Sequence, residues 1–89
     1  MASLLVQQSV KDFADWKVVF DSVKDFRLAS GELSEQVFHE SQNPNKVSVL
    51  LKWDSLADAE KFSKSPELKA AMQKGGVMGP PTITYLDEA

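Results

Sequence analysis

The sequence predicts an α+β fold in which one antiparallel sheet carries its helices on a single face. One observation is the alternation of apolar and polar side chains in residues 3–10, 46–53 and 82–87, as expected of half-buried strands. Another is the helical periodicity that follows the first of these stretches, and a third is the turn-rich segment 41–45. The resulting order β-α-β-β-α-β is typical of the ferredoxin-like split βαβ arrangement. We therefore expect residues 1–89 to form a single domain of this kind, with a four-stranded sheet.

The first half of the chain contains the first strand and the longest helical stretch. Asp12 is a natural N-cap for that stretch, and Gly31 ends it. Arg27 near its C-terminal end suits the negative pole of the helix dipole. The helical stripe contains Phe13, Trp16, Val19, Phe20, Val23, Phe26 and Arg27.

The second half of the chain predicts a hairpin, two short helices and a final strand. Residues 32–40 and 46–53 form the hairpin around the turn. Ser55 is the expected N-cap of the next helix, and Pro66 occupies the first position of a second one. We expect residues 79–81, Gly-Pro-Pro, to be a rigid connector before the last strand.

Composition excludes several classes of function. The net charge of −3 offers no electrostatic footprint for nucleic acid, and no apolar run approaches the roughly 20 residues of a membrane helix. The absence of cysteine excludes disulfides and thiolate metal sites, and one histidine with scattered carboxylates supplies no spaced metal-ligand set. The first residues lack the basic region of a signal peptide, so we expect a cytoplasmic protein without a nucleic-acid or membrane partner.

The face of the sheet that the helices leave uncovered predicts a partner. A simple hairpin register places Glu35 opposite Lys52, Val37 opposite Leu50 and His39 opposite Ser48, all on this second face together with Leu5, Gln7 and Ser9. Phe38 then faces the helices, although a slip of one residue would reverse every assignment. A face of this mixed character favours a homodimer whose two sheets enclose a partly polar cavity. A half-solvated sheet in a monomer is the alternative.

Three residues are candidates for chemistry in that cavity. His39 is the only side chain with an unperturbed pKa near neutrality, so it could act as a general base or proton donor, oriented by Glu35 or Ser48. Trp53 could line the mouth of the pocket, and Tyr85 could hydrogen-bond a phenolic ligand. His39 also has a structural interpretation, as a strand histidine at the dimer interface or in solvent, and Tyr85 has one as an anchor at the dimer edge.

Several motifs give the chain a family resemblance. They are residues 12–16 (Asp-Phe-Ala-Asp-Trp), Arg27, Gly31, residues 43–45 (Asn-Pro-Asn), 51–55 (Leu-Lys-Trp-Asp-Ser), 65–68 (Ser-Pro-Glu-Leu) and 75–81. Over nearly its whole length the chain resembles the dimeric α/β-barrel superfamily, specifically proteins related to antibiotic biosynthesis monooxygenases. The resemblance implies a homodimer and, for an enzyme, a reaction without a cofactor on an aromatic or polyketide-like substrate.

The haem-degrading members of that superfamily differ from this chain. They carry a histidine on the second helix shortly before a Ser-Pro pair, where this chain has residues 62–64, Phe-Ser-Lys. They also use an asparagine on the first strand, where this chain has Gln7 or Gln8. We therefore expect neither haem nor any other cofactor.

The sequence leads to one functional hypothesis and leaves alternatives open. We expect a homodimer that binds a small apolar or aromatic molecule between its two sheets. For an enzyme, we expect a cofactor-free monooxygenase in which His39 is the base. A non-catalytic ligand-binding or structural dimer, and an enzyme like a polyketide cyclase or isomerase, are the alternatives. The residues expected to line the site are Gln7, Glu35, Val37, Ser48, Leu50, Lys52, Trp53 and Tyr85.

Overall fold

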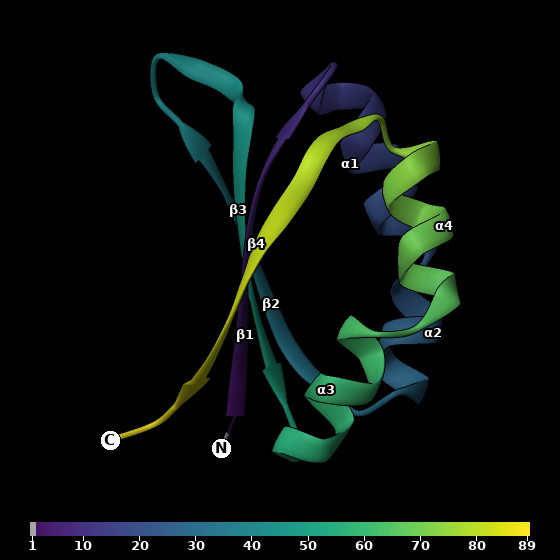
Figure 1. Ribbon diagram of the computed structural model, residues 1–89, viewed down its shortest axis with the longest axis vertical. Coiled ribbons are helices and arrows are strands. Elements are labelled where there is room, and N and C mark those ends of the chain that lie inside the picture. The colour runs from purple at the N-terminus through teal and green to yellow at the C-terminus, as the bar shows by residue number, and fades with distance from the viewer. Residues whose placement is uncertain (1) are drawn as a thin grey trace.

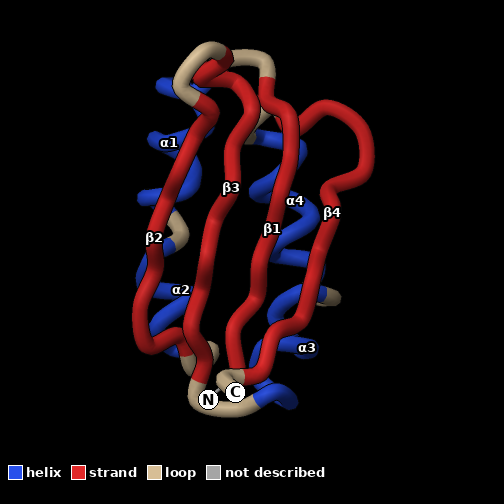
Figure 2. Tube along the Cα trace, turned by 90° about the vertical axis from the view of Figure 1, so that its left-hand side faces the viewer, coloured by secondary structure: helices blue, strands red, loops and turns tan. Residues whose placement is uncertain are grey.

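The computed structural model describes residues 2–89 and consists of one antiparallel sheet with all of the helices on one side (Figure 1). The strands lie in the order β2-β3-β1-β4, and each neighbouring pair is antiparallel. Figure 2 looks onto the sheet with the helices behind it, so that the near face is uncovered. The predicted ferredoxin-like fold class is confirmed. The strands are β1 (Ala2–Val10), β2 (Glu32–Glu40), β3 (Asn43–Trp53) and β4 (Val77–Asp87).

Side-chain caps set the starts of three helices, as the sequence predicts. Asp12 accepts from the Asp15 N–H at 3.0 Å, Ser55 from Asp58 at 3.1 Å, and Ser65 from Leu68 at 3.2 Å. The first helical stretch is two helices rather than one, because the chain leaves helical geometry at Val23. The helices are α1 (Phe13–Ser22), α2 (Lys24–Ala29), α3 (Leu56–Ser63) and α4 (Pro66–Lys74).

The last strand is longer than the sequence predicts. β4 begins at Val77, so residues 79–81 belong to the strand instead of forming a connector. Two prolines fit here because β4 is an edge strand, paired only with β1. The β1–β4 register shifts between Gln7 and Ser9, which leaves Gln8 at an irregularity of the sheet.

The core lies between the helices and the inner face of the sheet. It is almost entirely apolar, and Trp53, the last residue of β3, is completely buried. The described core cluster consists of Leu4, Val6, Val10, Trp16, Val47, Val49, Leu51, Trp53, Ala59 and Phe62.

The register of the β2–β3 hairpin differs by one residue from the expected one. Val37 pairs with Val49, not Leu50, and His39 pairs with Val47, not Ser48. The pairing shifts at the turn, between His39 and Glu40. There the Asn45 side chain accepts a hydrogen bond from the Phe13 N–H at 2.9 Å and donates one to the Lys11 carbonyl at 3.3 Å. Asn45 is thus tied to the start of α1, a long-range contact that the simple turn model does not include.

This shift reverses the faces of β2. Glu35, Val37 and His39 lie on the helix-facing side, and the prediction that they lie on the uncovered side is wrong. Phe38, expected in the core, lies on the uncovered face opposite Ser48 and is 52% exposed. A slip of one residue inverts a whole strand because side chains alternate strictly from face to face.

Candidate functional site

A small apolar cavity lies between the inner face of the sheet and the helices. Its volume is about 50 Å³. Side chains from β1, β3 and all four helices surround it, so the cavity occupies the centre of the domain and not the uncovered face. The lining residues are Val6, Gln8, Trp16, Val19, Phe20, Val23, Arg27, Val49, Leu51, Phe62, Leu68, Ala71 and Met72.

Gln8 is the one uncharged polar side chain in that lining. It projects to the inner face because its partner across the sheet is the buried Val47. Its Oε1 is buried and has no hydrogen-bond partner among the residues that the structure describes. An unpaired buried acceptor of this kind costs about 1–3 kcal/mol, so it favours a ligand that supplies a donor.

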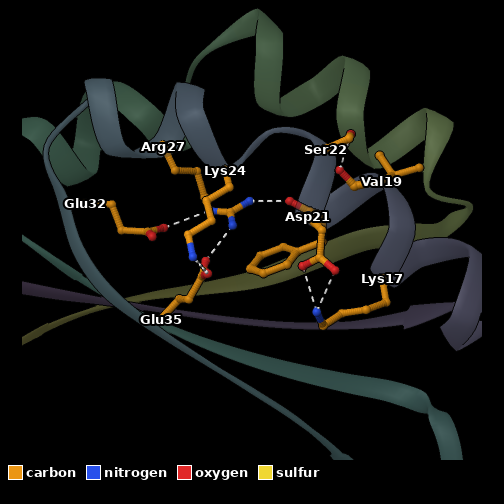
Figure 3. Close-up of polar contacts among 9 residues, drawn as sticks. Lys17, Val19, Asp21, Ser22, Lys24, Arg27, Glu32 and Glu35 are labelled. Atoms are coloured by element: carbon orange, nitrogen blue, oxygen red, sulfur yellow. Dashed lines mark hydrogen bonds and ion pairs between the residues drawn. The ribbon is translucent and has the colours of Figure 1, made fainter.

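Arg27 forms the charged end of the lining. Its Nε donates to Glu32 Oε2 at 2.8 Å, its Nη2 to Glu35 Oε2 at 2.5 Å, and its Nη1 to the Phe20 carbonyl at 2.6 Å. Figure 3 shows the guanidinium between the two carboxylates, with Lys24 on the outer side of Glu35. We call these four side chains, Lys24, Arg27, Glu32 and Glu35, the ion cluster.

The Phe20 ring belongs both to this arrangement and to the cavity. The Arg27 guanidinium carbon lies 3.8 Å from the ring centroid, within the range of a cation–π contact. Phe20 in turn stacks on Trp16, with ring centroids 5.0 Å apart. The charged end of the cavity is therefore continuous with an aromatic wall.

Burial makes Glu32 the most perturbed acid of the ion cluster. The Glu32 side chain is only 1% exposed. Desolvation raises its pKa from 4.5 to about 7, against the opposing attraction of Arg27, and the nearby Glu35 adds to the rise. Glu32 therefore changes its charge near neutral pH.

The predicted site residues divide between the two faces of the sheet. Gln7, Ser48, Leu50 and Lys52 do lie together on the uncovered face. There Gln7 pairs with Ser48 and Thr82, and Leu50 pairs with Leu5. Glu35, Val37, His39, Trp53 and Tyr85 are on the opposite side, so the predicted single cluster does not form.

The inner-face members of the predicted set have other neighbours. His39 is exposed, its Nδ1 lies 3.0 Å from the Glu40 carbonyl oxygen, and its ring packs edge-on against Phe13 at 5.1 Å. Neither Glu35 nor Ser48 orients it, because Glu35 binds Arg27 and Ser48 faces the other way. A catalytic role for His39 stays a prediction, although the side chain is not part of the cavity lining.

Trp53 and Tyr85 also lie outside the cavity lining. Trp53 packs against Phe62 with ring centroids 4.8 Å apart and is a core residue. Tyr85 pairs across the sheet with Leu4, and its hydroxyl lies 2.5 Å from the Ser63 hydroxyl of α3. Trp53 is thus part of the core, and Tyr85 links β4 to α3.

The sequence analysis did not predict that Gln8 and Arg27 line a cavity, or that Glu32 pairs with Arg27. The signal for Arg27 is a cation on the apolar stripe of a helix, which indicates a buried ion pair. Glu32 follows it by five residues, directly after Gly31, where the chain turns back beneath α2. Gln8 gave a weaker signal, a polar side chain in phase with the buried Leu4 and Val6.

The fold is a ferredoxin-like α+β domain with an interior cavity, and comparison with known proteins defines the family. The family model for antibiotic biosynthesis monooxygenase matches residues 9–74, and the chain belongs to this family. No curated protein sequence matches the chain.

Solved structures of low sequence identity share the fold over almost the whole chain. A putative antibiotic biosynthesis monooxygenase from Bordetella bronchiseptica is 11% identical with a TM-score of 0.83, covering 99% of this chain and 96% of its own. The cofactor-independent oxygenase SnoaB from Streptomyces nogalater is 11% identical with a TM-score of 0.81, covering 99% and 92%. A putative antibiotic biosynthesis monooxygenase from Caulobacter crescentus is 21% identical with a TM-score of 0.78, covering 99% and 89%.

No group of three or more histidines and carboxylates within residues 2–89 is arranged to hold a metal ion. No helix in the same part of the chain has the length and apolar character needed to cross a membrane.

Proposed function

We propose that the chain binds a small, largely apolar aromatic molecule in the interior cavity. The observation that carries this proposal is the unpaired Gln8 Oε1 in an otherwise apolar lining, a single buried acceptor that a ligand O–H or N–H would satisfy. Trp16 and Phe20 provide aromatic surface beside it. Apolar walls with a few placed polar groups are the usual composition of a small-molecule site.

The cavity must widen to admit a ring. Its volume of about 50 Å³ is well below the roughly 150 Å³ of a cavity that accepts benzene. α4 is the element best suited to move, because none of its residues is fully buried. Its Leu68, Ala71 and Met72 contribute one wall of the cavity, so an outward shift of α4 would open it.

The proposed reaction is monooxygenation without a cofactor. Family membership and the likeness to a cofactor-independent oxygenase support it. In such a reaction the diaryl methylene of an anthrone, whose anion is conjugated through the rings with the ketone, is deprotonated, and the carbanion then reacts with dioxygen. The CH₂ group becomes C=O, one oxygen atom enters the product and the other leaves as water. The protein would hold the substrate, stabilise its anion and exclude bulk water.

We also propose that the protein works as a cytoplasmic homodimer formed through the uncovered face of the sheet. Phe38 of β2 and Leu86 of β4 are 52% and 40% exposed there, and Leu5 and Leu50 are only partly buried. Burying such a face against a second copy would compensate for the small core of an 89-residue chain. The ligand proposed here lies inside each subunit, not between the two sheets.

Ligand binding without turnover is a second candidate function. Among the residues described, Arg27 is the one ionisable group that lines the cavity, and a permanently protonated guanidinium is no general base. A carrier or sensor would need only the apolar walls and the Gln8 acceptor. Oxygen consumption separates this candidate from the enzyme.

Binding can be tested with naphthalene-2-carboxamide as the probe. In a Trp53→Phe variant the remaining tryptophan, Trp16, lines the cavity, and its fluorescence should change in a saturable way. Ala71→Phe should abolish the change by filling the cavity, whereas Ala70→Phe, on the exposed side of the same helix, should preserve it. An equal response from both phenylalanine variants would place binding elsewhere.

Turnover can be tested with 1,8-dihydroxyanthrone in the absence of added cofactor. We expect oxygen uptake above the autoxidation rate, with the anthraquinone as product and loss of the excess rate in Ala71→Phe. Saturable binding with no excess oxygen uptake across anthrone and dihydroxyaromatic substrates would favour the carrier. Absence of binding would refute both functions.

A further inference from the structure

The ion cluster touches the cavity at one residue only, and that residue is a cation. Arg27 lines the cavity, whereas its partners Glu32 and Glu35 lie behind it. Arg27 donates three hydrogen bonds to the protein. A guanidinium carries five N–H bonds, so two remain without an acceptor in the described part of the chain. Arg27 and Gln8 are thus the two polar side chains among the residues that line the cavity.

The charge of the ion cluster depends on Glu32. With Glu32 ionised, Lys24 and Arg27 are balanced by two carboxylates and the cluster is neutral. With Glu32 protonated, the cluster carries one positive charge, next to a cavity with low-dielectric walls. An anion in the cavity would then be favoured, because a charge in such surroundings needs a compensating one.

The other charged groups around Glu32 leave this balance in place. Asp58 of α3 lies beside Gly31, where a Cβ added to the glycine would come within 2.5 Å of its Oδ2. From β3 the residue opposite Glu32 is Trp53, which does not titrate. From α2 the facing groups are the cations Arg27 and Lys24, and from β2 the group is Glu35.

We propose that the cavity selects acidic aromatic ligands, bound as anions against Arg27, and that Glu32 takes up one proton as they bind. This inference rests on the proposed aromatic-binding function and specifies the chemical class of the ligand. For a phenol or enol the ligand O–H bond breaks and an O–H bond forms on Glu32, with no net change of charge. For a ligand that is already a carboxylate, the proton comes from solvent.

Glu32 is a positioning residue in this scheme, since it acts through Arg27 and does not touch the cavity. Its raised pKa makes the uptake substantial at neutral pH, where part of the population is ionised before the ligand arrives. In the monooxygenase reaction, the same arrangement would stabilise a substrate anion and keep its proton inside the domain. His39 has no part in it.

The test compares two probes of equal shape, 2-naphthoate and naphthalene-2-carboxamide, by calorimetry. We expect the carboxylate to bind at least about tenfold more tightly at pH 6, with its affinity falling about tenfold for each pH unit above 7. Calorimetry at pH 7.5 in buffers of different ionisation enthalpy should show uptake of more than about half a proton for 2-naphthoate and none for the carboxamide.

Variants identify the group that takes up the proton. Glu32→Gln should bind 2-naphthoate with an affinity independent of pH between 6 and 9, without proton uptake. Glu35→Gln should keep a pH dependence but shift it to lower pH, because Glu35 helps to raise the pKa of Glu32. The exposed control Glu60→Gln should leave the pH dependence unchanged. The measurement of proton uptake by the wild type tests the proposal even if a variant folds poorly.

The outcomes separate the two proposals. Equal affinity for the two probes, or no proton uptake by the wild type, would overturn the selection of anions while leaving aromatic binding intact. Persistence of the pH dependence in Glu32→Gln would overturn the role of Glu32. Failure of both probes to bind would overturn the proposed function itself.

Discussion

Replacing Glu32 with glutamine should remove a loss of stability that the wild type undergoes as the pH rises. The folded state holds the Glu32 proton up to a pKa of about 7, whereas an ordinary glutamate loses it near 4.5. Between these values the folded chain binds more protons than the unfolded chain, so the free energy of unfolding falls as pH rises. Burial of the Glu32 side chain is the cause, since desolvation outweighs the attraction of Arg27.

The magnitude follows from the two pKa values. The difference between 4.5 and about 7 corresponds to roughly 3 kcal/mol of stability lost by the wild type from acid to alkaline pH. For a domain of this size, that is a shift in Tm of roughly 12–24 °C. Glutamine keeps the shape and a hydrogen-bond acceptor for Arg27 but does not titrate, so this component should vanish.

The assay is thermal and urea unfolding, followed by circular dichroism, at pH 5, 6, 7 and 8 and one fixed protein concentration. The quantity of interest is the stability of Glu32→Gln minus that of the wild type, which should increase from pH 5 to pH 8. The exposed Glu60→Gln provides the control for a general change in charge. A difference that stays constant with pH, or that decreases, would refute the reasoning about Glu32.

Four further predictions concern other parts of the molecule. Gln8→Leu should raise the stability of the unliganded protein by about 1 kcal/mol in urea unfolding, because it removes an unpaired buried acceptor; a loss would contradict the assignment. Gly31→Ala should lose about 2 kcal/mol or more, because its φ is 109° and the added Cβ would lie 2.5 Å from Asp58 Oδ2. Gly79→Ala, with φ 71° and open space around it, should lose only about 1 kcal/mol. Phe38→Asp should halve the mass measured by light scattering if the uncovered face forms a dimer, and an unchanged dimer would exclude this face.

Local signals in the sequence were sufficient for the fold. Asp12 and Ser55 cap the helices that they were expected to cap, Pro66 begins α4, and Gly31 adopts the positive φ expected at the end of a helix. These features depend on neighbours within a few residues, so a single sequence contains them. The element order then left few arrangements of the sheet.

The faces of β2 could not be predicted, because they depend on contacts between residues that are far apart in the sequence. They depend on where the hairpin register shifts, and the shift depends on Asn45 binding the backbone at Lys11 and Phe13, more than 30 residues away. Glu35 and His39 were consequently assigned to the wrong side. The cavity was missed as well, because it requires Gln8 on β1 and Arg27 on α2 to be placed around the same space.

The arrangement of polar groups in the core supports a functional interpretation of the cavity. A domain with so small a core is only marginally stable. Proteins in which apolar residues replace a buried ion pair are often as stable or more stable. Here the buried charges converge on Arg27, which lines the same cavity as the unpaired oxygen of Gln8. Within residues 2–89, the other buried side-chain atom without a hydrogen-bond partner is Trp53 Nε1, which lies outside that lining. The unpaired Gln8 oxygen and the buried charges at Arg27 are exceptions to an apolar, fully hydrogen-bonded core, and both lie at the same cavity. Such exceptions are expected where a bound ligand completes the structure. Comparing Glu32→Gln with the wild type measures what the buried Glu32 charge costs in stability.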